Sequence, residues 1–190
     1  MSADRYRPSR MGNQRNARGV PYREDMGALA PGAGITAGSG TLYKSWVRRG
    51  EGGIIVTDIL MDLTGLSSST TDLDIIGTAG VCHIGQITTA KNGIILAGTM
   101  TCFEVPAGGA DDIDLYSATV GTGAYDAGIA ALVETAVVTS AAAWTNGRVL
   151  PIIADTIPAN NYLYLCGGEA GTAAAYTAGR FLITLHGYAA

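Results

Sequence analysis

The sequence is poor in charged side chains. Only 15% of its 190 residues are charged, against about 25% in ordinary soluble domains, and 47% are apolar. A small monomer with so little charge would expose much apolar surface, and large apolar exposure usually marks an interface. We therefore expect a chain that works in a permanent assembly rather than as a free monomer.

Long apolar runs and paired cysteines are also missing. No uninterrupted apolar run reaches the ~18–20 residues that a membrane-spanning helix needs, and the first residues lack the apolar segment of a secretory signal. We therefore expect no membrane partner. The cysteines are odd in number and lie in apolar, strand-like runs, which predicts buried free thiols in a chain made in a reducing cytoplasm: Cys82, Cys102 and Cys166.

Catalytic motifs are lacking as well. Gly32 begins a G-x-G-x-x-A match, but Pro31 and a linker precede it where a dinucleotide-binding fold needs a strand. Neither a phosphate-binding G-x-x-x-x-G-K-S/T motif nor a G-x-S-x-G nucleophile motif occurs. His83 and His186 lie in strand-like runs, where a lone histidine is more often structural than a general base. We expect no enzyme activity and no cofactor.

Metal-binding patterns are weak. The cysteines and histidines show neither C-x-x-C nor H-x(3–5)-H spacing, so we interpret the cysteines as core thiols and expect no zinc site. The acidic run GGADDID carries Asp111, Asp112 and Asp114 without the order of an EF-hand loop. A solvated turn is the preferred interpretation, and a calcium site is the alternative.

The N-terminus is what stands out. Residues 1–23 hold six arginines against one acid, a net charge of +5, so residues 24–190, with six basic and fifteen acidic side chains, have a net charge of −9. A basic segment that is poor in apolar residues cannot fold alone, and it usually serves to hold a partner. The candidate partner-binding residues of this arm are Arg5, Arg7, Arg10, Arg15, Arg18, Tyr22 and Arg23.

Two partners fit the arm. Arginines can neutralise phosphates of a nucleic acid, or they can pair with carboxylates on an acidic protein surface. The basic residues are dilute and include no lysine, and Tyr6, Met11 and Tyr22 can anchor in protein grooves. We therefore favour a strap on a protein, and nucleic-acid binding remains the alternative.

The rest of the chain predicts a β-rich body. We expect residues 1–41 to form the arm and a Gly/Ala linker that is flexible unless a partner fixes it, and residues 42–190 to form one domain. Short apolar runs alternate with turn signals, which indicates an all-β fold: a jelly-roll-like antiparallel β-sandwich. The expected strands are residues 42–48, 53–63, 73–76, 81–87, 93–105, 113–119, 149–154, 162–166 and 181–187.

Three local features complete this prediction. Lys91-Asn92-Gly93 is a hairpin turn signal, and Pro106 is expected to stop the strand that follows it. Apolar spacing within residues 124–138 predicts one short helix. In residues 162–166 the tyrosines and leucines alternate, so one side is expected to enter the core and the other to meet a neighbour or solvent.

The C-terminal part resembles a known class of protein. Residues 157–165 (IPANNYLYL) and 176–188 (YTAGRFLITLHGY) are similar to the ends of capsid decoration, or cement, proteins of short-tailed marine and freshwater phages. The resemblance covers about the last hundred residues. It implies a β-sandwich body with an N-terminal extension over neighbouring major capsid subunits. The arm of this chain would have the role of that extension, but the resemblance assigns no role to individual residues.

The leading hypothesis is therefore a structural virion protein. It would bind the outer surface of an icosahedral phage capsid, after assembly in the host cytoplasm, and cement major capsid subunits through its arm and a homo-oligomeric body. A trimer is the first choice and a dimer the second. The alternatives are a jelly-roll coat protein of a small virus whose arm binds the packaged genome, and a glycan-binding module of a virion that uses Trp46 and Trp144.

Overall fold

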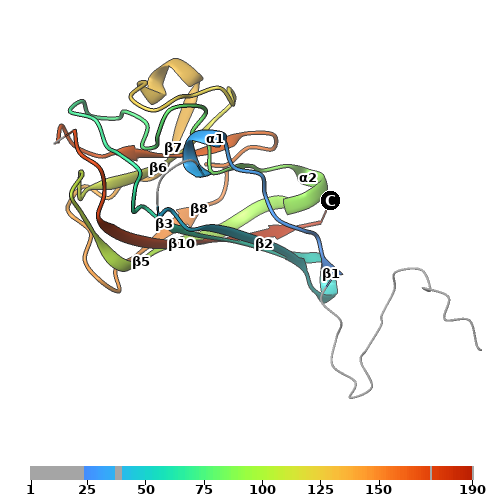
Figure 1. Cartoon of the computed structure of the whole chain (residues 1–190). Helices are drawn as coiled ribbons and strands as arrows, with labels where there is room; N and C mark the ends of the chain where they lie inside the picture. The colour runs from blue at the N-terminus through green and yellow to red at the C-terminus, as the bar shows by residue number, and fades with distance from the viewer. Residues whose placement is uncertain (1–23, 37–39, 172, 190) are drawn as a thin grey trace, which may run out of the picture.

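Two antiparallel sheets stack in layers (Figure 1). The structure, a computed structural model, describes residues 24–36, 40–171 and 173–189. The larger sheet has six strands in the order β1-β2-β3-β10-β5-β8. Their bounds are β1 Glu24–Asp25, β2 Tyr43–Arg49, β3 Ile54–Asp62, β10 Ala178–Tyr188, β5 Ile94–Ala107 and β8 Val149–Ile153.

The smaller sheet has four strands in the order β4-β9-β6-β7. Their bounds are β4 Gly85–Gln86, β9 Tyr162–Gly167, β6 Ile113–Ala118 and β7 Glu134–Val138. The helices are single turns: α1 Ala33–Thr36, α2 Thr89–Asn92 and the 3₁₀ turns η1 Glu51–Gly53 and η2 Ile129–Leu132. The predicted all-β antiparallel sandwich is confirmed, and none of the helices in the described residues is long and apolar enough to cross a membrane.

The last eight strands pair in a nested way. β3 pairs with β10, β4 with β9, β5 with β8 and β6 with β7, all antiparallel. The first of the eight thus pairs with the last and the second with the second last, as in one long hairpin rolled into two layers. This pairing brings the chain ends of the body together in the larger sheet.

The core lies between the sheets. Phe181 of β10 contacts Trp144 edge to face, with ring centroids 5.1 Å apart, and the indole Nε1 of Trp144 donates to the Ile113 carbonyl at 2.8 Å. Strand alternation sends the inner residues of β3 and β10 into this layer, and Ile59 and Ile183 are fully buried. The apolar inner sides of the two sheets thus pack against each other, and this buried contact holds the sandwich together.

The outer side of the smaller sheet is covered by the chain itself. Residues 119–133 cross over it, on the side away from the larger sheet (Figure 1). The Tyr164 hydroxyl of β9 donates to the Val120 carbonyl at 2.9 Å and accepts from the Gly123 amide at 3.2 Å. Tyr164 is fully buried and Tyr162 is partly buried, so this side of β9 mostly meets the covering segment of the same chain rather than solvent or a neighbour, which corrects the prediction from its alternating residues.

Residues 24–36 pack on the sandwich, although the sequence predicts an arm and a flexible linker there. Leu29 and Ile35 are buried, and Gly34 donates from its amide to the Val81 carbonyl at 2.7 Å. A Cβ at Gly34 would lie 2.5 Å from the Cys82 sulfur, so only glycine permits this approach. The glycines serve close packing here rather than flexibility.

Other local predictions need correction. Within residues 124–138 the helix is limited to the 3₁₀ turn η2, because the β-branched residues that follow extend into β7 and pair with β6. Residues 89–92 form α2, which connects strands of different sheets, so the 91–93 turn is not a hairpin. β5 continues through Pro106, beside a register shift in its pairing with β10 where a missing N–H is tolerated.

The predicted strands at residues 73–76 and 81–87 are mostly absent. Asp74, Ile75 and Val81 form isolated bridges, and only Gly85–Gln86 forms a regular strand. The remaining predicted strands are confirmed, with ends that differ by at most three residues.

Candidate interaction surface

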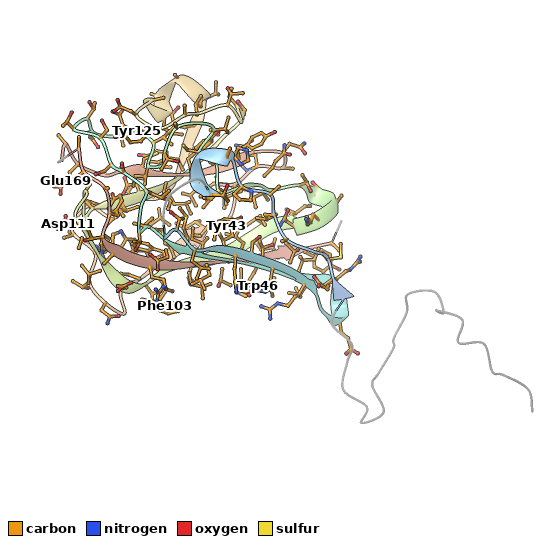
Figure 2. All side chains as sticks on the ribbon, in the orientation of Figure 1. Tyr43, Trp46, Phe103, Asp111, Tyr125 and Glu169 are labelled. Atoms are coloured by element: carbon orange, nitrogen blue, oxygen red, sulfur yellow. The ribbon has the colours of Figure 1, made fainter. Side chains whose placement is uncertain are left out.

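The outer side of the six-stranded sheet carries large apolar side chains that solvent reaches. Alternate residues of each strand face away from the core, and Ile153 is 68% exposed, Ile94 55% and Trp46 42%. Figure 2 shows Trp46 and Phe103 on the side of the sheet away from the other layer. We call the following set the apolar face: Trp46, Ile54, Ile94, Leu96, Phe103, Val105, Val149, Ile153 and Tyr188.

The strand register joins these side chains into rows. Tyr188 of β10 lies opposite Ile54 of β3 on one side and Ile94 of β5 on the other. In another row, Ile153 of β8 lies opposite Ala97 of β5. The row of Tyr188 is apolar across three strands, whereas the row of Trp46 continues into Asp58 and Thr184. Clustered exposed apolar side chains of this kind mark interaction sites.

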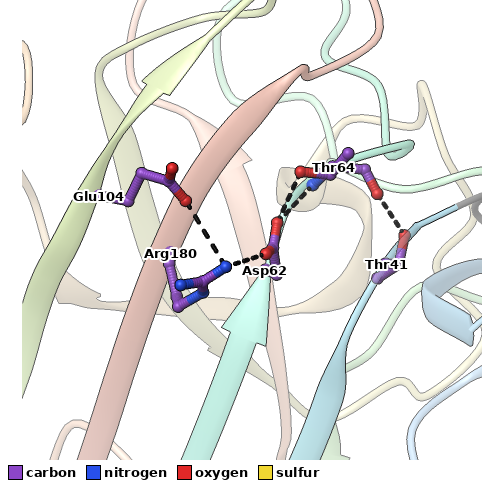
Figure 3. A network of polar contacts seen from close by, with 5 residues as sticks. All are labelled: Thr41, Asp62, Thr64, Glu104 and Arg180. Carbon is purple, nitrogen blue, oxygen red and sulfur yellow. Dashed lines mark hydrogen bonds and ion pairs between the residues drawn. The ribbon is translucent and has the colours of Figure 1, made fainter.

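A polar network borders the apolar face. The Arg180 guanidinium of β10 lies 2.7 Å from a carboxylate oxygen of Asp62 on β3 and 3.8 Å from one of Glu104 on β5 (Figure 3). Burial alone would raise the pKa of Asp62, but hydrogen bonds from Arg180 and Thr64 outweigh it and hold that pKa below its usual value. Asp62 therefore stays ionised at neutral pH, and the network joins strands β3, β10 and β5.

A second ion pair lies beneath Trp46. Arg48 of β2 pairs with Asp58 of β3, and the Thr184 hydroxyl donates to Asp58 at 2.9 Å. Asp58, Asp62 and Glu104 thus each have an arginine partner. A surface whose charges are already paired attracts a partner by apolar contact rather than by long-range charge.

The arm joins the body at an edge of the same sheet. Its predicted partner-binding residues, Arg5, Arg7, Arg10, Arg15, Arg18, Tyr22 and Arg23, lie outside the described residues. The described chain begins at Glu24 in β1, which pairs with Arg49 of β2. The arm therefore starts one strand away from Trp46, so arm and apolar face can engage one partner together.

The other candidate side chains are structural. Cys82, Cys102 and Cys166 are free and buried, as predicted, and burial raises the pKa of each thiol. His83 packs against the Tyr162 ring at 4.9 Å, and burial lowers its pKa. The cysteine environments favour the unreactive thiol over the nucleophilic thiolate.

Trp144 belongs to the core. It is 1% exposed, and Arg148 stacks over its indole ring at 5.2 Å from the ring centroid. The buried ring cannot stack on a sugar in this structure, which leaves Trp46 as the exposed tryptophan. A glycan site built on both tryptophans is not what the fold provides.

Sequence reasoning anticipated an apolar interface but did not find its residues. The available signal was that residues 93–105 and 149–154 are largely apolar at odd and at even positions alike. A strand of an antiparallel sheet normally has polar residues on the side that faces water. No protein family, curated protein or solved structure matches the chain.

Proposed function

We propose that this chain is a structural virion protein that binds the outer surface of an icosahedral phage capsid and cements neighbouring major capsid subunits. One observation carries the proposal: a strongly basic arm begins at the edge of the sheet whose outer side is apolar and charge-paired. The arm would pair with acidic groups of the shell, and the apolar face would lie on a major capsid subunit beside them.

The mechanism is multivalent attachment. Exposed ion pairs contribute only ~0–1 kcal/mol each, so six arginines alone make a weak, salt-sensitive tether. The apolar face adds contact area that salt does not screen, and a homo-oligomer, a trimer in our first choice and a dimer in our second, raises the effective concentration of every further arm. No cofactor, membrane or nucleic acid takes part in this proposal.

The strand pairing supports the assignment of the body to a jelly roll. Eight strands in two four-stranded halves, paired first with last, match the double Greek key of that architecture. Jelly rolls are frequent in viral capsids, which favours a role in a virion. The architecture by itself does not distinguish a protein that forms the shell from one that binds to it.

Binding to particles tests the proposal. Particles stripped of the protein are mixed with the purified chain and sedimented, at low and at high salt. Removal of residues 1–23 is expected to weaken binding sharply while the body stays folded, because the described body begins at Glu24. Undiminished binding of the shortened chain would refute the strap.

Variants of the apolar face separate body from arm. Ile153→Ser with Trp46→Ser is expected to lower particle binding at least tenfold without unfolding the chain. Val133→Ser is the matched control, because Val133 is 67% exposed but lies on the covering segment and not on the apolar face. If the double variant binds normally and only its oligomer dissociates in a sedimentation experiment, the apolar face joins copies of the chain instead.

The arm can be tested at single residues. Because Tyr22 can anchor in a protein groove, we expect Tyr22→Ala to cost more affinity than replacing any one of Arg5, Arg7 and Arg10 by Ala. We also expect attachment to weaken only modestly as the salt concentration rises. Steep loss with salt and a silent Tyr22→Ala would indicate a purely electrostatic tether.

A coat protein whose arm binds the packaged genome is the second candidate. The nested strand pairing favours it equally, since shell-forming proteins of small viruses also use jelly rolls. Purification in low salt distinguishes the two: a genome-binding arm retains nucleic acid that residues 24–190 alone release, whereas a strap yields protein free of it.

A further inference from the structure

A group of acidic residues lies at the end of the sandwich away from β1. Asp111 and Glu169 mark this end in Figure 2, and β1 lies at the other end in Figure 1. Three segments contribute: the connection from β3 to β4, the start of β6 and the connection from β9 to β10. The acidic cluster is Asp72, Asp111, Asp112, Asp114 and Glu169.

Two of these carboxylates are buried and converge. Asp112 and Asp114 are each only 5% exposed. A Cβ at Gly168 would lie 2.6 Å from Asp112 Oδ1 and 3.0 Å from Asp114 Oδ1, so both oxygens point into the space beside this glycine. Asp114 Oδ1 accepts from the Ser140 amide at 2.7 Å.

The Asp112 oxygen has no partner. Its Oδ1 is buried without a hydrogen bond among the described residues. A buried carboxylate oxygen left unpaired is costly, and native proteins normally pair such a group with a donor or a cation. The arginine pairs on the outer side of the larger sheet involve Asp58, Asp62 and Glu104, and none of them reaches the acidic cluster.

The neighbouring carboxylates repel one another. Burial raises the pKa of Asp114, and the charges of Asp112 and Asp72 raise it further, while the Ser140 amide opposes them. The pKa of Glu169 is raised by its hydrogen bond with Asp111 and by the surrounding acids. The raised pKa values show that negative charge in the cluster is unfavourable, which a bound cation would relieve.

We propose that the space beside Gly168 binds a calcium ion held by Asp112 and Asp114. Calcium accepts six to eight oxygen ligands in irregular geometry, including main-chain carbonyls and waters. No three acidic, histidine or cysteine side chains in the described ranges are grouped closely enough to hold a metal by themselves, so main-chain oxygens and water complete the site. Affinity is expected in the weak class, about 10⁻⁴–10⁻³ M.

The geometry favours a compact ion over the alternatives. A single Cβ at Gly168 would already contact the Oδ1 atoms of both Asp112 and Asp114, and a planar guanidinium needs more room than that. Magnesium demands near-ideal octahedral geometry, which Asp112 in the loop before β6 and Asp114 within β6 do not supply. The ion would tie the β6 start to the β9–β10 connection and stiffen this end of the body, independently of capsid binding.

Thermal unfolding with calcium chloride tests the site in the full chain. After chelation, calcium at about ten times the dissociation constant is expected to raise Tm by about 3–6 °C at pH 7, with a smaller effect of magnesium. Asp112→Asn should abolish the calcium shift. Asp126→Asn, an exposed acid outside the cluster at φ 65°, which Asn tolerates, should keep it.

A second variant fills the site without changing its charge. Gly168→Ala adds a methyl group against Asp112 Oδ1 and should also abolish the calcium shift. No shift in the unaltered chain up to 10-fold above ~10⁻³ M calcium would overturn the proposal. A second result would also overturn it: Asp112→Asn raises Tm in chelator, and calcium changes the Tm of neither the variant nor the unaltered chain. That result would indicate that carboxylates of the acidic cluster share a proton.

The arm offers one further control. Removal of residues 1–23 is expected to leave the calcium shift unchanged. A shift that appears only after this removal would assign the cluster to the arginines of the arm and overturn the proposal.

Discussion

The two sheets of this sandwich differ in whether another segment of the described chain covers their outer sides. Residues 119–133 cover the smaller sheet, and Tyr164 of β9 is fully buried beneath them. The larger sheet has no such cover among the described residues, and Trp46 and Ile153 are exposed. The outer side of each sheet carries large apolar side chains, and only those of the larger sheet are left exposed by the described residues, which is why we propose that side as the interaction surface.

The largest expected difference between the two sides is in stability. Tyr164→Ala should lower the free energy of unfolding by about 3–5 kcal/mol, because it leaves a cavity and removes the hydroxyl that joins two main-chain groups of the covering segment. Trp46→Ala should change it by less than about 1 kcal/mol. Urea unfolding of the two variants checks this, and equal losses would mean that the two outer sides are equivalent.

Acid should affect the two sides in opposite directions. The folded-state pKa of Asp62 is held below its usual value, so its contribution to stability is present at neutral pH and is lost as pH falls through that folded pKa. The folded-state pKa of Asp114 is raised, so its ionised form costs stability once pH exceeds its unfolded pKa, and protonation in acid removes that cost.

Two amide variants, studied in a metal chelator, test this contrast. Asp62→Asn should cost about 1–2 kcal/mol at pH 7, at the lower end of the range for a broken charged hydrogen bond because the Arg180 side chain is 43% exposed. The cost should shrink below about pH 4. Asp114→Asn should instead stabilise the chain at pH 7 and match it in acid. Parallel pH profiles of unfolding would contradict the opposite signs.

The smallest effect concerns the covering segment. Val133 follows η2 with φ 56°, a conformation that β-branched residues avoid, and its side chain is exposed. Val133→Asn should therefore raise stability by about 0.5–1 kcal/mol, since Asn tolerates this backbone and little apolar contact is lost. Thermal unfolding measures it, with Ala131→Asn as the control expected to show no gain.

Local sequence pattern was enough for the long strands and the fold class. Alternating and continuous apolar runs in residues 53–63, 93–105 and 181–187 predict the long strands that the structure contains as β3, β5 and β10. The buried free cysteines also follow from their apolar surroundings. These features depend on neighbouring residues, and a period of two is visible without knowing the partner strand.

The linker and the single-turn helices were not predictable in this way. Glycines of residues 28–36 suggested flexibility, yet Gly34 packs against Cys82, which is far away in the sequence. The 91–93 turn has hairpin residues, but its flanking strands belong to different sheets. In both cases the outcome depends on where distant segments dock, and tertiary contacts override local turn and helix preferences.

The sequence by itself determined the charge division between a basic arm and an acidic, apolar, β-rich body. Only the tertiary structure decided which apolar side is covered, which tryptophan is buried, and that Asp112 and Asp114 meet beside Gly168. The physical reason is that composition and alternation fix how much apolar and charged surface a chain has. The docking of loops far apart in sequence then decides how much of that surface remains in contact with water.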